Sequence, residues 1–104
     1  IKDVSSITAS GSDQSGAAAL LNADIFSVTV NVSNNGVKLM PAAAGLCIYV
    51  KNFSGSNLLK VYPNASDSID ENGTNGPIVI GAKGQIQFVA HSASQWYSVG
   101  ATYA

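Results

Sequence analysis

The chain has 104 residues, of which 46% are hydrophobic and only 11% are charged, and its formal net charge at pH 7 is −1. This length favours one domain with one modest core. Soluble proteins carry about 25% charged residues on average, so a surface this poor in charge favours a protein that covers itself with its own copies. The near-neutral balance, with lysine as the only basic residue besides one histidine, argues against nucleic acid and anionic membranes as partners. No apolar run reaches the roughly 20 residues that span a bilayer.

Residues 1–16 are rich in Ser, Asp and Gly and show little periodicity. We expect an N-terminal arm or linker here, followed by a single β domain over residues 17–104. In an oligomer such an arm can lie against a neighbouring subunit. The short apolar stretch 17–23 fits either one helical turn or the start of a strand.

From residue 25 onward, apolar and polar residues alternate with the period of two that half-buried strands show. Turn residues interrupt this pattern roughly every 6–12 residues, a spacing typical of sandwiches and barrels. The expected strands cover residues 25–32, 37–40, 46–50, 58–62, 77–80, 85–90 and 95–99. The sequence therefore predicts an all-β fold of about seven or eight short strands, a small antiparallel β-sandwich or barrel of the jelly-roll kind.

The inward positions of this alternation predict the core. They are Val28, Val30, Val37, Leu39, Leu46, Ile48, Val50, Leu59, Val61, Ile69, Ile78, Ile80, Ile86, Phe88 and Trp96. The positions between them, such as Ser27, Lys38 and Gln87, should point away from the core, because a slip of one residue would reverse every side chain of a strand.

Two of the expected strands carry apolar side chains on both faces. In one, Cys47 and Tyr49 lie opposite the core positions, and in the other Tyr97 and Val99 lie opposite Trp96. A strand buried on one side only is normally polar on the other. We therefore predict a contact with another subunit, with Tyr49, Tyr97, Val99 and the N-terminal arm as interface candidates. The alternative is that loops of a sandwich cover both faces.

Groups that carry out catalysis are scarce. The single histidine, His91, falls in an expected turn, where a surface residue is the ordinary interpretation, and Cys47 lies within a strand, where free cysteine behaves as a small hydrophobe. Structural zinc sites take four ligands. We therefore predict no enzymatic activity, no catalytic residue and no cofactor or metal.

Asp67, Asp70 and Glu71 form the one acidic cluster. A calcium ion would accept their oxygens, but their spacing does not match an EF-hand loop. Because Asp and Asn side chains commonly fix turns, we interpret the polar stretch 64–76 as a loop.

Two further patterns have a functional and a structural interpretation. Triplets that match the acceptor for N-glycosylation begin at Asn31, Asn52, Asn64 and Asn72. Without a signal-peptide pattern at the start of the sequence, we interpret them as chance products of a composition rich in Asn, Ser and Thr. The neighbouring Trp96 and Tyr97 resemble a platform for stacking sugar rings, but aromatic residues also fill cores and interfaces, and we favour core or interface.

Four phrases of the sequence carry a resemblance to a known family. They are 36–46 (GVKLMPAAAGL), 59–63 (LKVYP), 67–69 (DSI) and 95–100 (QWYSVG). In this order and spacing, they resemble a small all-β domain of virion structural proteins in tailed bacteriophages and prophages, especially in fibre-type appendages. The resemblance covers roughly residues 20–100. It departs from the family at the acidic residues after Ile69 and matches nothing specific in the N-terminal arm.

The resemblance implies a structural role in a phage-like virion, as a fibre or decoration domain that works as a homo-oligomer, with a trimer favoured. Its partners would be its own copies and other virion proteins, and it would assemble in the host cytoplasm before reaching the extracellular space. The resemblance also implies that Ile69 is buried in its turn and that Trp96 closes the core. The alternative is a carbohydrate- or receptor-binding module at a fibre tip, with a host surface glycan as its ligand.

Overall fold

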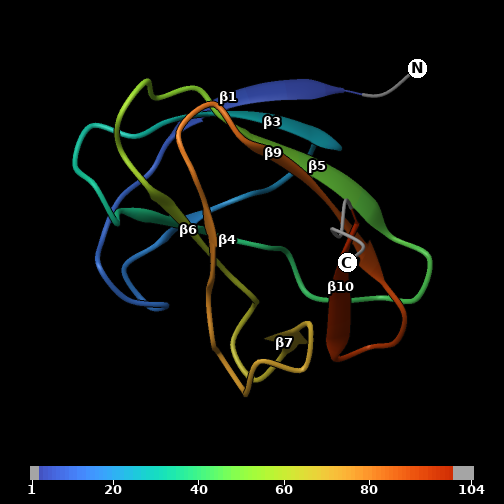
Figure 1. Cartoon of the computed structure of the whole chain (residues 1–104). Helices are drawn as coiled ribbons and strands as arrows, with labels where there is room; N and C mark the ends of the chain where they lie inside the picture. The colour runs from blue at the N-terminus through green and yellow to red at the C-terminus, as the bar shows by residue number, and fades with distance from the viewer. Residues whose placement is uncertain (1–2, 100–104) are drawn as a thin grey trace, which may run out of the picture.

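The computed structural model describes residues 3–99, which form β-strands and connecting turns without a helix (Figure 1). The strands are β1 (Val4–Thr8), β2 (Ala18–Ala19), β3 (Ile25–Thr29), β4 (Gly36–Lys38), β5 (Cys47–Asn52), β6 (Leu59–Tyr62), β7 (Ser68–Ile69), β8 (Ile78–Ile80), β9 (Gln85–Ala90) and β10 (Gln95–Val99). The all-β class expected from the sequence is confirmed. Nothing in this part of the chain is a helix long and apolar enough to cross a membrane.

The first six strands alternate between two sheets. The odd-numbered strands β1, β3 and β5 lie side by side in a six-stranded sheet, and the even-numbered strands β2, β4 and β6 lie side by side in a four-stranded sheet. All four of these pairings are parallel. The chain therefore winds in coils around a shared core, as in a β-solenoid. Figure 1 shows β1, β3, β5 and β9 across the top of the molecule, with β4 and β6 below them.

The last strands reverse direction and close the coils. β8 pairs antiparallel with β6, and β9 pairs antiparallel with β5. β10 then pairs antiparallel with β9 and parallel with the short β7 at the far edge of the six-stranded sheet. The sheets are thus mixed, and the expected antiparallel jelly roll is corrected to a solenoid-like arrangement. The period-two pattern indicates which face a residue takes and carries no information on the direction of the partner strand.

The segment 1–16 contributes a strand where the sequence predicted an arm or linker. β1 pairs in parallel with β3 over its whole length, from Val4 opposite Ile25 to Thr8 opposite Thr29. It is an edge strand, so backbone hydrogen bonds and the inward side chains of Ile7 and Ala9 hold it in place. Its outward positions are polar apart from Val4, which leaves little hydrophobic alternation for sequence analysis to detect.

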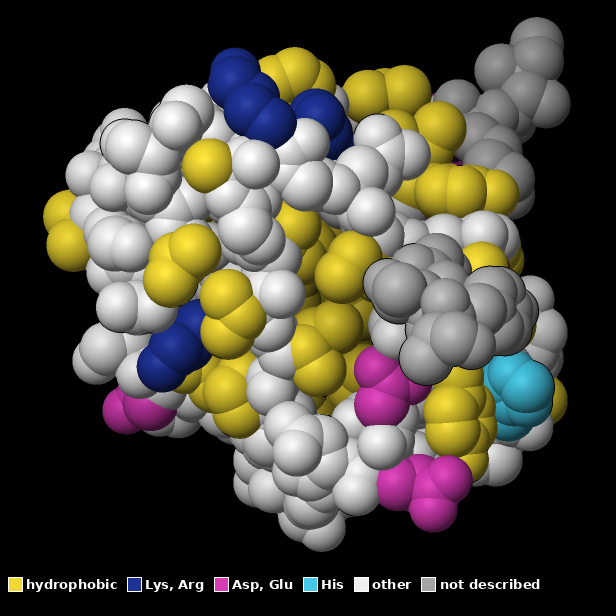
Figure 2. All heavy atoms as spheres, in the orientation of Figure 1, with side chains coloured by type: hydrophobic (Ala, Val, Ile, Leu, Met, Phe, Trp, Pro, Cys, Tyr) yellow, Lys and Arg dark blue, Asp and Glu magenta, His cyan; other side chains and the backbone are white. Residues whose placement is uncertain are grey.

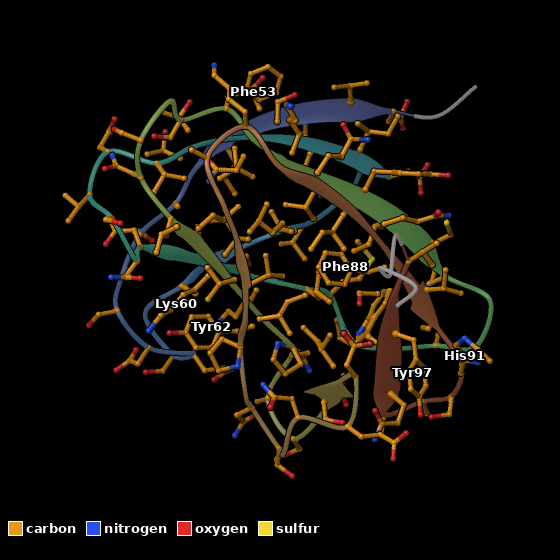
Figure 3. The ribbon with its side chains drawn as sticks, viewed as in Figure 1. Phe53, Lys60, Tyr62, Phe88, His91 and Tyr97 are labelled. Carbon is orange, nitrogen blue, oxygen red and sulfur yellow. The ribbon has the colours of Figure 1, made fainter. Side chains whose placement is uncertain are left out.

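The predicted core is confirmed. Twelve of its members are buried, and the other three, Leu46, Ile78 and Ile86, pack against them. The core also includes residues that the sequence analysis did not choose: Ala9, Leu20, Phe26, Ala42 and Ala90. The positions predicted to face away, such as Ser27, Lys38 and Gln87, are half-buried, so the predicted faces of these strands are correct. Phe88 lies in the middle of this core (Figure 3).

A buried amide joins the two sheets at one end of the coils. Asn52 is the last residue of β5 and is fully buried. Its Nδ2 donates to the backbone oxygens of Asn57 at 2.9 Å, Ile80 at 3.1 Å and Gly81 at 3.2 Å, and its Oδ1 accepts from the backbone N–H of Ser54 at 2.9 Å. A side chain used in this way is a structural clamp, since buried polar groups require partners. It cannot serve as a glycan acceptor in the folded chain.

Gly36 allows two successive coils to approach closely. A Cβ atom at this position would lie 2.7 Å from the ring of Tyr62. That ring lies beside Lys60 at the lower left of Figure 3 and its hydroxyl donates to the backbone oxygen of Ser12 at 3.1 Å. Burial raises the pKa of the Tyr62 hydroxyl, and the nearby carboxylate of Asp13 adds to the rise.

Candidate functional site

The face of the six-stranded sheet that points away from the core, here called the outer face, carries all three predicted interface residues. Tyr49 lies in β5 between the buried Ile48 and Val50, and in β10 Tyr97 directly follows the buried Trp96. Because side chains alternate between the faces of a strand, Tyr49, Tyr97 and Val99 all point outward. The structure therefore brings together on one surface residues that lie 50 positions apart in the sequence.

The outer face contains a row of side chains that crosses five adjacent strands. Val4, Ile25, Tyr49, Gln87 and Val99 stand in register, each opposite the next. Directly opposed side chains in neighbouring strands lie about 4.5–5.5 Å apart at Cβ, so the five form a continuous stripe, which we call the apolar row. Its two ends are well exposed, Val4 at 63% and Val99 at 48%.

A shorter row runs beside the apolar row. Tyr97 stands opposite Val89, which stands opposite Cys47. The one amide among these residues is occupied, because Nε2 of Gln87 donates to the Cys47 sulfur at 2.8 Å and to the Tyr49 hydroxyl at 3.2 Å. These contacts engage the Gln87 side-chain nitrogen and the Tyr49 hydroxyl oxygen within the sheet, among neighbours that are otherwise apolar. Cys47 is half-buried on this face and is a free thiol.

Tyr97 also belongs to a polar cluster at the margin of the outer face. Its hydroxyl donates to Oε2 of Glu71 at 3.0 Å, and its ring meets the ring of His91 edge-on at a centroid distance of 4.7 Å. The neighbouring Asp70 accepts from the backbone N–H of Ser98 at 2.8 Å and from its hydroxyl at 2.6 Å. Figure 3 shows His91 and Tyr97 side by side, and Figure 2 shows acidic side chains close to the histidine.

The electrostatics of this cluster act on the tyrosine. The hydrogen bond to Glu71 raises the pKa of Tyr97, and partial burial and the nearby carboxylates of Glu71 and Asp70 add to the rise. An ionised phenol would lose its hydrogen bond and face two negative charges.

The three acidic residues of the loop 64–76 are each used separately. Asp67 is buried and its Oδ2 accepts from the backbone N–H of Ala42 at 3.0 Å, while Asp70 and Glu71 have the partners given above. Between residues 3 and 99, no three His, Cys, Asp or Glu side chains lie where they could hold a metal ion together. The carboxylates therefore fix turns and strand ends.

The opposite half of the outer face is polar and contains a shallow groove. Ser6, Ser27, Thr29 and Phe53 line this groove, whose volume is about 370 Å³. Phe53 is 50% exposed, and the ammonium of Lys51 lies 5.7 Å from the centroid of its ring. Figure 3 shows Phe53 at the top of the molecule, beside β1.

Sequence reasoning missed two residues of this face. Ile25 lies between Val4 and Tyr49 in the apolar row, and Phe53 lines the groove. The available signal was the alternation itself: Phe53 continues the outward positions of β5 beyond Lys51, and Ile25 precedes the inward Phe26. Both were overlooked because a single outward apolar residue is common on protein surfaces.

Comparison of the chain with models of known protein families gave no match, and comparisons with curated proteins and with solved structures gave none either.

Proposed function

We propose that this domain is a structural component of a phage-like virion, a fibre or decoration domain that works as a homo-oligomer. Three copies are the favoured number, and the partners are further copies of the chain and other virion proteins. The resemblance of residues 20–100 to fibre-type virion domains supplies the virion role and its location in the particle. No nucleic acid, membrane or enzymatic activity enters this proposal.

The apolar row is the observation that carries the homo-oligomer. It joins Val4, Ile25, Tyr49 and Val99 across five strands of one sheet, and Tyr97 extends it on one side. Aromatic residues and a depletion of charge mark the centres of protein interfaces. The low charge of the chain, 11% of residues, supports the same interpretation.

Closed symmetry allows a small number of copies to cover the outer face of every copy. Most soluble homo-oligomers close on themselves, and three-fold closure would give each domain two identical neighbours, as a projecting fibre requires. An interface of this kind should bury more than about 1,000 Å², the area that separates biological contacts from packing contacts. The stripe from Val4 to Val99 runs across most of the six-stranded sheet, which makes the outer face the best candidate for such an area.

The test is the mass in solution, measured by light scattering at micromolar concentration in neutral buffer. We expect a mass near three times the 10.6 kDa of one chain. Val99→Glu should lower the mass, because it places a charge at the end of the apolar row. Val79→Glu is the matched control, since Val79 is 49% exposed against 48% for Val99 and lies on the other sheet. A parent mass of one chain would refute the homo-oligomer.

The polar groove favours a second candidate function, a glycan- or receptor-binding module at a fibre tip. Three hydroxyl-bearing residues beside a half-exposed aromatic ring are groups that bind sugars through hydrogen bonds and stacking. Trp96, the residue first considered as a sugar platform, is fully buried, so this role would pass to Phe53. A glycan array probed with the parent and with Phe53→Ala tests it: binding that only the parent shows would favour this candidate, and its absence from the parent would remove it.

A further inference from the structure

Three Asn-Gly pairs occur in the sequence: Asn35–Gly36, Asn72–Gly73 and Asn75–Gly76. In such a pair the backbone nitrogen of the glycine can attack Cγ of the asparagine, expelling ammonia and forming a five-membered succinimide. Water then opens this ring at either carbonyl and leaves aspartate or isoaspartate. Glycine favours the attack because it has no Cβ and adopts a wide range of backbone angles. Whether a pair reacts in a folded protein depends on whether the attacking nitrogen is free to approach.

The first pair is held rigidly. Gly36 begins β4 and is buried, and its N–H donates to the backbone oxygen of Ser10 at 3.2 Å. The backbone oxygen of Asn35 accepts from Lys60 at 3.1 Å. The nitrogen that would attack is therefore engaged between two coils, and the ring of Tyr62 lies against Gly36.

The third pair is held by its own turn. The N–H of Gly76 donates to the backbone oxygen of Gly73 at 3.1 Å. Oδ1 of Asn75 accepts from the backbone N–H of Ser66 at 2.7 Å, and the backbone N–H of Asn75 donates to Asp67 at 2.9 Å. Both the attacking nitrogen and the side chain under attack are thus fixed.

The second pair differs at the attacking nitrogen, although the backbone N–H of Asn72 donates to the oxygen of Ile69 at 2.9 Å. Asn72 and Gly73 are exposed, and within residues 3–99 the N–H of Gly73 has no hydrogen-bond acceptor. Apart from its two chain neighbours, no residue has an atom within 4 Å of the Cβ position of Gly73, which has a φ of +87°. One exposed hydrogen bond restrains the side chain, from Nδ2 of Asn72 to the backbone oxygen of Pro77 at 2.9 Å.

We propose that Asn72–Gly73 is a site of spontaneous deamidation in the folded protein. The backbone nitrogen of Gly73 forms a bond to Cγ of Asn72 and loses its proton to solvent. The side-chain nitrogen of Asn72 takes up a proton from solvent and leaves as ammonia, and one water molecule then opens the succinimide. The product carboxylate changes the formal net charge from −1 to −2. It cannot donate to Pro77 and lies next to Glu71, the partner of Tyr97, so the change loosens the turn at the margin of the outer face.

The experiment follows all three pairs in one sample. The purified full chain is incubated in mildly alkaline buffer, and peptide mapping by mass spectrometry measures the acid formed at Asn35, Asn72 and Asn75 over time. We expect Asn72 to react at least about tenfold faster than the other two, a ratio equivalent to about 1.4 kcal/mol in the barrier. A parallel sample unfolded in urea should bring the three rates together, because the structural restraints are removed.

Two variants separate the chemistry from the surroundings. Asn72→Gln should abolish acid formation at this position and leave the rates at Asn35 and Asn75 unchanged, and an Asn75→Gln variant should still react at Asn72. Faster or equal reaction at Asn35 or Asn75 in the folded chain would overturn the proposal. The proposal would also be overturned if Asn72 did not react in the folded chain over a time in which it reacts in the urea sample.

Discussion

Trp96 stabilises the core through packing, without a hydrogen bond from its side chain within residues 3–99. It is the largest of the fully buried side chains, and its indole N–H has no acceptor among the residues that the structure describes. An unsatisfied buried donor costs about 1–3 kcal/mol. The ring must therefore contribute through packing and removal of apolar surface from water, which outweigh that cost.

Trp96→Ala should lower the free energy of unfolding by about 3–5 kcal/mol, the range for removing a large buried aromatic residue. Trp96→Phe should cost clearly less, because it keeps an aromatic ring and deletes the unsatisfied N–H. Urea unfolding followed by circular dichroism measures both. If Trp96→Ala unfolded at the parent's urea concentration, the packing argument would be wrong.

Tyr97 links stability to alkaline pH. Its pKa in the folded chain is raised above 10.0, so the folded state holds the phenol proton more tightly than the unfolded state. This contribution is fully present below pH 10 and is lost as the pH rises through the raised pKa, since the unfolded state then binds fewer protons. The parent should therefore lose its stability advantage over Tyr97→Phe on going from about pH 9 to about pH 11. Urea unfolding of both proteins across this range measures the difference, and a pH-independent difference would contradict the linkage.

At the scale of single residues, the sequence predicted which large apolar side chains are buried. Trp96 and Ile69 were expected to be buried and are, because large apolar residues in alternating strands have few other positions to take. The partners of the polar residues could not be predicted. Asp67 reaches Ala42, 25 positions away, and Asn52 reaches Ile80, 28 positions away, and no local pattern records such long-range contacts.

At the scale of strands, the sequence predicted faces better than boundaries. The alternation across β5, β9 and β10 placed the buried and outward residues correctly. It also extended the strand at 25–32 too far: β3 ends at Thr29 and Val32 is 61% exposed. The chain bends from residue 31 onward, so Val32 continues the apolar alternation of the sequence without packing against the core.

The sequence analysis missed β1 because backbone hydrogen bonds to β3, and not a pattern of apolar side chains, hold this strand. The carbonyl of Asp3 accepts from Ile25, and the N–H of Ala9 donates to Thr29. By the alternation of a parallel ladder, the N–H of Ser5 also points toward β3 and that of Ser6 points away. The backbone therefore holds this strand through every second residue, whatever the side chains are.

Ser5→Pro should destabilise the protein more than Ser6→Pro. Proline removes a ladder donor at residue 5, a loss of about 0.5–1.5 kcal/mol before any strain, whereas edge strands tolerate proline where the N–H faces away from the sheet. The two variants change the same residue type at adjacent positions, so each is the control for the other. Urea unfolding compares them, and equal losses would show that β1 does not pair with β3 in this register.

The whole molecule has two different ends. The coils run in parallel from β1 and β2, which form the outer edges of the two sheets, to β8 and β9, which run in the opposite direction, and β10 returns beside β9. The outer face crosses from one end to the other, so its apolar row includes residues of the parallel coils and of the strands that follow them, β9 and β10. The sequence could not predict this row, because its register depends on four successive strand pairings that link Val4 at one end to Val99 at the other.

The proposed oligomer predicts that heat stability depends on concentration. If copies associate through the apolar row, the folded state is favoured by mass action, and the Tm of the parent should rise as protein concentration rises. Tyr49→Ser removes the aromatic ring from the middle of the row and should make the Tm nearly independent of concentration. Val32→Ser is the control, because Val32 is exposed in a turn away from the row, and it should keep the dependence of the parent. Scanning calorimetry over a wide range of concentrations measures all three proteins. A parent whose Tm is the same at every concentration would show that unfolding is not coupled to dissociation and that the apolar row holds no copies together.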